Sequence, residues 1–218
     1  HKMDNSEIIK ALEEKYKNLG ENPETYLKRL LQAKPITYWD YIQVDTLLSL
    51  QKTRTDFKDE EIFVMYHQVT ELTLKMMIHE IENLSEEIWL IKLDRLKRYT
   101  RMLITSFDIM KDGMSYDDYN TFRSTLTPAS GFQSAQFRIL ELYSTRLENL
   151  INSEGRERLP QNPTLDDYFK HIYWKDAGLN RKTGKMTLTL SLFIEKYEAD
   201  FKALAENVKG KTLEERVG

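Results

Sequence analysis

A long amphipathic segment between Asp59 and Leu84 constrains the fold of this chain more than any other feature. Placed at steps of about 100° around a helix, its apolar side chains cover more than half of the circumference. One broad apolar arc consists of Ile62, Met65, Tyr66, Val69, Leu72, Thr73 and Met76. A separate stripe adjoins it and consists of Phe63, His67, Thr70, Leu74 and Met77. Such a helix would be roughly 40 Å long. Its length and apolar surface predict the central helix of a bundle.

The remaining arc of this segment is polar and is predicted to face solvent. It carries Gln68, Glu71, Lys75, His79 and Glu82. Glu71 and Lys75 stand four residues apart, a spacing that predicts a favourable ion pair on one helix face.

Helical periodicity recurs along most of the sequence, and glycine (8) and proline (5) are scarce. Further helices are predicted within 4–34, across most of 37–51, and over about 86–112, 133–152 and 190–208, with a polar linker over Gly155 to Asn162. These patterns predict an all-α fold, a helical bundle with long central helices. We expect a single all-helical domain over 1–218, in which N-terminal helices at 4–34 and C-terminal helices at 163–209 flank a core at 38–152.

Composition narrows the classes of function. The chain has 218 residues, of which 40% are hydrophobic, and a formal net charge of −3. No global basic field would attract nucleic acid, and the local run Arg95, Lys97, Arg98 and Arg101 fits one solvated helix face better than a phosphate track. No apolar run reaches the roughly 18 residues of a membrane span. The absence of cysteine excludes thiolate chemistry and fits a reducing cytoplasm, the expected location.

His67 is the first residue with a chemical role to consider. It lies on the apolar side of the long helix, beside Phe63 and Leu74. One interpretation is a core histidine whose ring nitrogens are satisfied by a backbone carbonyl. The other is an imidazole that points into a pocket, ready to bond a ligand N–H or to move a proton. No paired metal-ligand spacing occurs around any histidine, so no metal ligand is assigned within the chain.

A corner between two predicted helices, Phe122 to Arg138 (FRSTLTPASGFQSAQFR), is the second candidate. Arg123 stands four residues after Tyr119, and Ser130-Gly131 form a polar turn soon after. A partly buried guanidinium needs an anionic partner. That partner is either a carboxylate of the protein, as an internal salt bridge, or the carboxylate of a bound small molecule.

Together these residues resemble the tryptophan 2,3-dioxygenase family. Three blocks carry the resemblance: YWDYIQVDTLLSLQ at 38–51, DEEIFVMYHQVTELTLK at 59–75, similar to the family's HQxxELWxK helix, and the corner at 122–138. The match is strong over roughly residues 38–140. The chain departs from the family at Thr73, where a tryptophan is usual, and at Lys58, where a histidine is common.

The resemblance implies roles for the residues of the second and third blocks. His67 would hydrogen-bond the indole N–H of the substrate, and Phe63 would pack on the indole ring, both next to heme. Arg123, helped by Tyr119, would bind the substrate carboxylate. The remaining residues would line the heme and substrate pocket: Leu126, Ser130 and Gly131.

The first block would act between subunits. Tyr38, Tyr41 and Ile42 match residues that close the substrate pocket of a neighbouring subunit in a homotetramer. The expected partners are therefore L-tryptophan, dioxygen and further copies of this chain, with no nucleic acid and no membrane.

The resemblance implies an oxidoreductase that uses heme iron to cleave the indole C2–C3 bond of L-tryptophan, giving N-formylkynurenine in the first step of the kynurenine pathway. The family's axial histidine and its Gly-Thr-Gly-Gly loop lie further downstream, whereas this sequence has no histidine after His171. We therefore expect the axial histidine outside this chain and interpret the sequence as truncated. The alternatives are a heme-less helical module that binds aromatic amino acids, and a heme-dependent aromatic amino acid hydroxylase.

Overall fold

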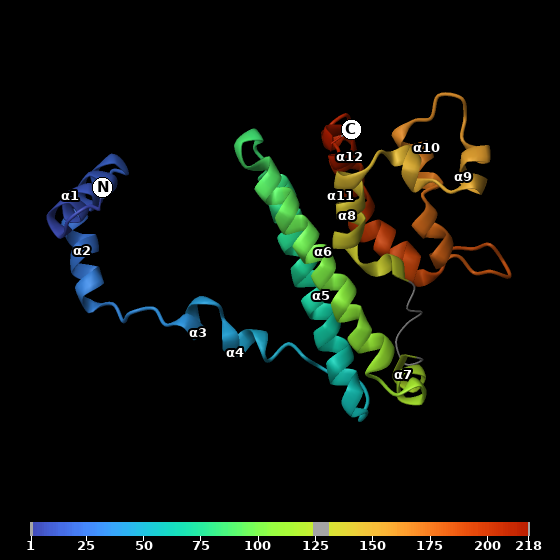
Figure 1. Cartoon of the computed structure of the whole chain (residues 1–218), viewed down its shortest axis with the longest axis horizontal. Coiled ribbons are helices and arrows are strands. Elements are labelled where there is room, and N and C mark those ends of the chain that lie inside the picture. The colour runs from blue at the N-terminus through green and yellow to red at the C-terminus, as the bar shows by residue number, and fades with distance from the viewer. Residues whose placement is uncertain (1, 124–130, 218) are drawn as a thin grey trace. The chain divides into compact units, whose positions relative to one another are not determined.

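The computed structural model describes residues 2–123 and 131–217, and helices dominate both ranges (Figure 1). The predicted all-α fold is confirmed. Extended pairing in these ranges is limited to two isolated bridges, Ile151 with Ile172 and Leu179 with Met186. None of the described helices combines the length and the apolar character that a membrane crossing requires.

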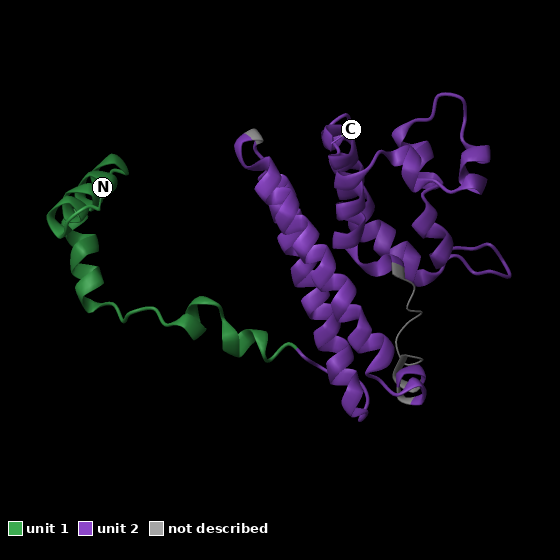
Figure 2. Cartoon of the chain, viewed as in Figure 1, with its two compact units in different colours: residues 1–50 green, residues 51–218 purple. Residues whose placement is uncertain are grey.

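The chain divides into two compact units, residues 1–50 and 51–218 (Figure 2). The first contains α1 (Asn5–Asn18), α2 (Pro23–Gln32), α3 (Tyr38–Tyr41) and α4 (Val44–Leu47). The expectation that both units belong to one domain stays a prediction.

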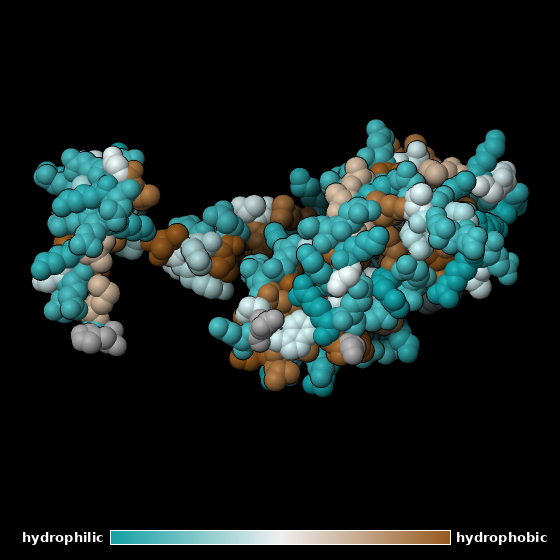
Figure 3. All heavy atoms as spheres, turned by 90° about the horizontal axis from the view of Figure 1, so that it is seen from above, coloured by the Kyte–Doolittle hydropathy of each residue, from teal (hydrophilic) through white to brown (hydrophobic). Residues whose placement is uncertain are grey.

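Local sequence signals explain the helices of the first unit. Asp4 and Glu7 form a capping box at the start of α1, and Gly20 takes the left-handed conformation after its end. The rings of Tyr16 and Tyr26 stack at 4.2 Å between α1 and α2. Among residues 2–50 no side chain is buried, and Leu31 is 88% exposed. Figure 3 shows hydrophobic residues at the surface of the molecule.

The second unit begins with two long helices that lie side by side (Figure 1). They are α5 (Lys58–Glu82) and α6 (Trp89–Asp112), joined through the short 3-10 helix η1 (Glu86–Ile88). After them come α7 (Tyr116–Arg123), η2 (Gly131–Gln133), α8 (Ala135–Ser144), η3 (Leu147–Leu150), α9 (Ser153–Arg158), α10 (Leu165–Lys170), η4 (Tyr173–Gly178), α11 (Leu188–Val208) and α12 (Leu213–Val217). α8 packs against both α5 and α11, so it connects the long pair to the C-terminal helices.

The buried face of α5 differs from the prediction. Leu74, Met77 and Ile81 form a core with Leu96 of α6, so the C-terminal part of the stripe beside the broad arc faces inward. Most of the broad arc is exposed in the second unit, with 50% of Val69 and 49% of Leu72 accessible to solvent. The reason is that α6 and α8 both pack on the same side of α5.

A second core lies among η2, α8, η3, α10, η4 and α11. Trp174 is at its centre, with its ring edge-on to Phe193 and Phe201 at 5.5 and 6.3 Å between centroids. Such edge-to-face arrangements are favourable for aromatic rings. Phe132 of η2 also enters this core and is 1% exposed.

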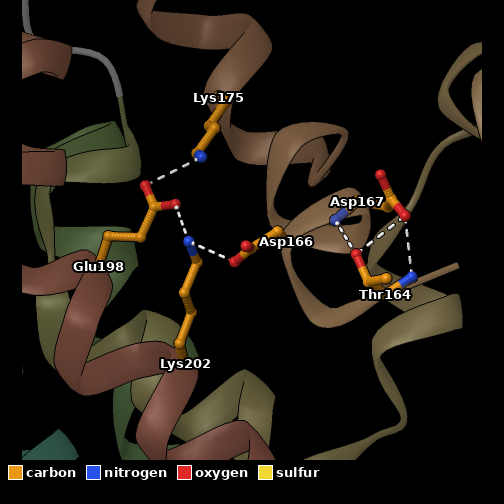
Figure 4. Close-up of polar contacts among 6 residues, drawn as sticks. All are labelled: Thr164, Asp166, Asp167, Lys175, Glu198 and Lys202. Carbon is orange, nitrogen blue, oxygen red and sulfur yellow. Dashed lines mark hydrogen bonds and ion pairs between the residues drawn. The ribbon is translucent and has the colours of Figure 1, made fainter.

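A network of ion pairs links three of the segments that form this second core (Figure 4). The carboxylate of Glu198 on α11 accepts from Lys175 at 3.0 Å and from Lys202 at 3.2 Å. Lys202 also reaches Asp166 of α10 at 2.9 Å. The network therefore connects α10, η4 and α11 through alternating charges.

Two predicted boundaries are wrong in this region. The helix expected over 133–152 ends at Ser144, because Thr145 is extended and its hydroxyl donates to Glu214 at 2.5 Å. The expected linker over Gly155 to Asn162 instead begins inside α9. Gly155 is buried there, and a Cβ at this position would lie 2.8 Å from the side chain of Ile151, so the glycine serves close packing.

A buried ion cluster joins α5 to α6. Glu80 is buried on α5 and pairs with Lys92 and with Arg95, whose Nη1 lies 3.1 Å from Glu80 Oε1. The hydrogen bond from Lys92 lowers the pKa of Glu80 below its usual value of 4.5, burial opposes this shift, and Arg95 adds to it. Because the pKa of Glu80 is lower in the folded than in the unfolded protein, its ionised carboxylate adds to the free energy of unfolding at any pH above the unfolded-state pKa. This contribution is lost as the pH falls through the folded-state pKa.

We expect Glu80→Gln to lower the free energy of unfolding by about 3 kcal/mol at pH 7, because it leaves Lys92 buried without its counter-charge. The difference from the unchanged protein should shrink as the pH falls below 4.5, where the unfolded state takes up a proton, and it should be lost once the pH passes the lowered pKa of Glu80 in the folded protein. Urea unfolding at a series of pH values measures it. A difference that stays constant down to pH 3 would contradict the assigned role.

Helix α11 offers a matched pair of variants for the second core. Phe201→Ala should cost about 3–5 kcal/mol of unfolding free energy, because the ring is only 2% exposed among other aromatic rings. Leu192→Ala on the same helix removes a side chain that is 55% exposed and should change stability by less than about 0.5 kcal/mol. Equal losses in denaturant unfolding would show that the core is assigned wrongly.

Candidate functional site

Helices α5 and α7 bring three of the predicted site residues together. The ring centroid of Phe63 lies 4.2 Å from that of His67 and 6.1 Å from that of Tyr119 on α7. Phe63 and Tyr119 are half-buried, whereas His67 is exposed. Figure 1 shows α7 beside the N-terminal half of α5. The result is an aromatic wall with an imidazole at its accessible edge.

His67 is oriented by its own helix. Its Nδ1 lies 2.7 Å from the backbone carbonyl oxygen of Phe63, one turn earlier. Because a carbonyl oxygen only accepts, Nδ1 must carry the hydrogen and donate it. In the neutral ring, Nε2 then keeps its lone pair and can accept a hydrogen bond from a ligand N–H.

The interpretation of His67 as a core histidine is wrong in one respect and right in another. A backbone carbonyl does satisfy one ring nitrogen. The side chain is nevertheless exposed, with the ring of Tyr66 edge-on at 5.2 Å. The imidazole can therefore contact a ligand.

The corner residues are described only in part. Arg123 is the last residue of α7 and lies one helical turn after Tyr119, which places both on one face of that helix. The side chain of Arg123 lies outside what the structure describes, as do Leu126 and Ser130 entirely. Gly131 begins η2, and its surroundings also lie outside the described part.

The second half of the corner is held firmly. Phe132, directly after Gly131, inserts into the C-terminal core 5.4 Å from the ring of Phe193. Ser134 then caps α8, with its hydroxyl accepting from the backbone N–H of Phe137 at 3.2 Å. The chain therefore leaves the corner from a fixed point.

The three residues predicted to close a neighbouring pocket belong to the first unit. Tyr38 and Tyr41 lie on α3 and are 72% and 73% exposed, and Ile42 follows them at 40%. The first unit is described by itself, so their role in a neighbouring subunit stays a prediction. Exposed aromatic side chains in this number fit a surface that another molecule covers.

Sequence reasoning missed two contacts that hold the segments around the site. The side-chain amide of Gln136 on α8 donates to the backbone oxygen of Glu71 at 2.7 Å and to its Oε2 at 2.9 Å. The amide of Gln51 donates to Oε1 of Gln68, next to His67, at 2.8 Å. The predicted ion pair between Glu71 and Lys75 does not form among the described residues, and the carboxylate of Glu71 accepts a hydrogen bond from Gln136 instead. The one sequence signal related to these contacts is that glutamine recurs in the three motif blocks.

The described residues at this site include no cluster of possible metal ligands. In the ranges 2–123 and 131–217, no group of three or more His, Asp or Glu side chains is placed to hold a metal ion. The described residues offer the accepting Nε2 of His67 beside the rings of Phe63 and Tyr119.

Comparison with known proteins identifies a family whose sequences match this chain. A sequence model of the family described as tryptophan 2,3-dioxygenase matches residues 27–211. The tryptophan 2,3-dioxygenase of Bacillus thuringiensis strain Al Hakam is 38% identical over 113 residues, 49% of this chain and 40% of that protein. That of Ruegeria sp. strain TM1040 is 34% identical over 137 residues, 59% of this chain and 48% of that protein. The chain thus spans about half the length of the curated relatives it matches.

The tautomer of His67 can be measured directly. In the imidazole ¹⁵N spectrum at a pH where the ring is neutral, we expect the hydrogen on Nδ1. His79 is an internal control with the opposite expectation, because the amide Nδ2 of Asn83 lies 3.5 Å from its Nδ1 and favours hydrogen on Nε2. Hydrogen on Nε2 of His67 would contradict the orientation described for the lone pair.

Proposed function

The chain belongs to the tryptophan 2,3-dioxygenase family, and from this premise we propose that it contributes the substrate-facing side of a heme-dependent dioxygenase that opens the indole ring of L-tryptophan. The proposed reaction cleaves the indole C2–C3 bond with dioxygen and gives N-formylkynurenine. Because the chain spans only part of its relatives, the activity of the whole protein is part of the proposal.

The orientation of His67 is the observation that carries this proposal. Indole presents one N–H donor on an otherwise flat apolar ring. The wall offers the complement, the accepting Nε2 of His67 beside the rings of Phe63 and Tyr119. A site built to accept an N–H discriminates against ring analogues that lack it, because the acceptor would be left without a partner.

The same residues fit one side of a bound heme. The macrocycle is flat and mostly apolar, and the aromatic wall of α5 and α7 presents half-buried rings and no cluster of charged ligands among the described residues. Heme, when bound, would supply the activation of dioxygen. The chain's own residues would bind the substrate, hold its indole N–H at His67 Nε2 and limit the access of water.

Arg123 would supply the second anchor of the substrate. A guanidinium can hold a carboxylate through two parallel hydrogen bonds, so it fixes orientation as well as charge. Its place on the same helix face as Tyr119 supports this role. Leu126, Ser130 and Gly131 would complete the pocket.

Further copies of the chain would close the pocket. We propose a homotetramer in the cytoplasm, in which Tyr38, Tyr41 and Ile42 of one subunit cover the substrate of another. Their exposure in the first unit supports this arrangement.

The proposal is tested with the full-length protein. Heme titration should give a Soret band that shifts when L-tryptophan is added, and turnover with dioxygen should give N-formylkynurenine. A hydroxylated amino acid as product would overturn the proposed reaction. Tryptophan binding without any heme uptake would overturn the dioxygenase and favour the amino-acid-binding module.

The two anchors should contribute unequally to turnover. Arg123→Ala should lower kcat/KM by about 100-fold, because a charge-assisted pair to the substrate carboxylate is lost. His67→Ala should lower it by roughly tenfold, the value of one neutral hydrogen bond. Steady-state kinetics of both variants, with Arg123→Lys as the control that keeps the charge, checks this order. Comparable or reversed losses would contradict the assigned roles.

A further inference from the structure

The imidazole of His67 contacts two aromatic rings of its own helix. The ring of Phe63 lies 4.2 Å from it between centroids, tilted by 41°, and belongs to the aromatic wall that would face the indole. The ring of Tyr66 lies 5.2 Å from it at an interplanar angle of 85°. Tyr66 is half-buried, whereas His67 is exposed. The accessible imidazole is therefore in contact with a more buried ring that has no role in the proposed pocket so far.

The hydrogen bond of His67 leaves one property of its ring open. Two side-chain torsions place an imidazole, whereas the contact between Nδ1 and the backbone oxygen of Phe63, at 2.7 Å, is one distance with a directional preference. This contact decides which nitrogen carries the hydrogen. The direction in which Nε2 points depends also on the tilt of the ring, which one hydrogen bond at one nitrogen does not determine.

The ring of Tyr66 supplies a second constraint on the imidazole. Aromatic pairs favour edge-to-face geometry with centroids about 4.5–7 Å apart, and the pair of Tyr66 and His67 has this geometry. Neighbouring side chains on a helix diverge by about 100°, so their position in the sequence alone does not bring these rings together. His67 is exposed, so the close packing of a surrounding core does not hold its ring. A tilt of the imidazole would weaken the edge-to-face contact.

We propose that Tyr66 is a positioning residue that holds the plane of the His67 imidazole, so that Nε2 points toward the N–H of a bound ring. This inference rests on the proposed function, in which His67 accepts the indole N–H. Tyr66 then contributes to selectivity, because a fixed acceptor favours a ring that carries N–H over the same ring methylated at that nitrogen. A mobile imidazole loses part of this preference, since ordering it on binding costs entropy.

The orientation is measured first without a ligand, in the full-length protein before heme is added. Relaxation of the ¹³Cε1–H group of each histidine reports ring motion on the picosecond to nanosecond timescale. Tyr66→Ala should lower the order parameter of the His67 ring, and Tyr66→Phe, which keeps the aromatic ring, should leave it unchanged. His79 is the internal control, and its order parameter should be the same in the unchanged protein and in both variants.

Selectivity is measured next with two ligands, L-tryptophan and 1-methyl-L-tryptophan, in which a methyl group replaces the hydrogen of the indole N–H. Equilibrium titration of the heme-loaded full-length protein gives both affinities. Tyr66→Ala should lower the ratio of the two affinities by about twofold to tenfold, the range that one edge-to-face aromatic contact covers. Tyr66→Phe should keep this ratio.

Tyr99→Ala distinguishes positioning from a general loss of stability. Tyr99 is a half-buried tyrosine of α6 that packs on the core between α5 and α6. Its replacement should lower the midpoint of thermal unfolding, while the ratio of affinities and the His67 order parameter stay unchanged.

Four results would overturn the inference. An unchanged His67 order parameter in Tyr66→Ala would show that Tyr66 does not hold the imidazole, and an unchanged ratio of affinities would remove its role in selectivity. Equal changes in Tyr66→Phe would assign the effect to the hydroxyl, and equal changes in Tyr99→Ala would assign it to general stability. If the proposed function itself fails, the unchanged protein binds no L-tryptophan, and the motion of His67 still decides whether Tyr66 positions the ring.

Discussion

The burial of one stripe of α5 is the constraint on which the rest of the second unit depends. Leu74, Met77 and Ile81 face α6 and α8 together, so a single helix face sets the place of both neighbours. Removing that area from water is the main favourable term, and it is non-directional. Direction comes from polar contacts on the same helix, with Glu80 toward α6 and Glu71 toward α8. Apolar burial brings the helices together, and the carboxylates of Glu80 and Glu71 fix their relative position.

Sequence periodicity predicted the helices because it reports local geometry. It did not predict which of the two apolar arcs of α5 is buried, since Val69 and Leu74 satisfy the same pattern and only tertiary neighbours distinguish them. The break at Thr145 was missed for a related reason. The hydroxyl of Thr145 is held by Glu214, a residue far along the chain that no local window contains.

The site shows the same division between local and distant information. The resemblance implied that His67, Phe63 and Tyr119 serve one substrate, and the structure places the ring of Phe63 near those of His67 and Tyr119. The sequence predicted an ion pair between Glu71 and Lys75, because both lie on the polar face of the helix, four residues apart. The half-buried carboxylate of Glu71 instead accepts a hydrogen bond from Gln136 of α8, because a buried charge requires a polar partner. The sequence of α5 alone contains no information about this partner. The roles of Arg123, Leu126, Ser130, Tyr38 and the other members of the proposed pocket stay predictions.

The acceptor that orients His67 is a main-chain oxygen. The shape of the wall and the orientation of the imidazole therefore do not have to change together. Every substitution at position 63 keeps the carbonyl, so the side chain there can vary in size without altering which imidazole nitrogen bears the hydrogen. The shape of the aromatic wall therefore depends on the side chain at position 63. The nitrogen of His67 that accepts a hydrogen bond depends instead on the main-chain carbonyl of the helix. Substitution at position 63 can therefore reshape the aromatic wall for another ring system while the preference for an N–H donor stays intact.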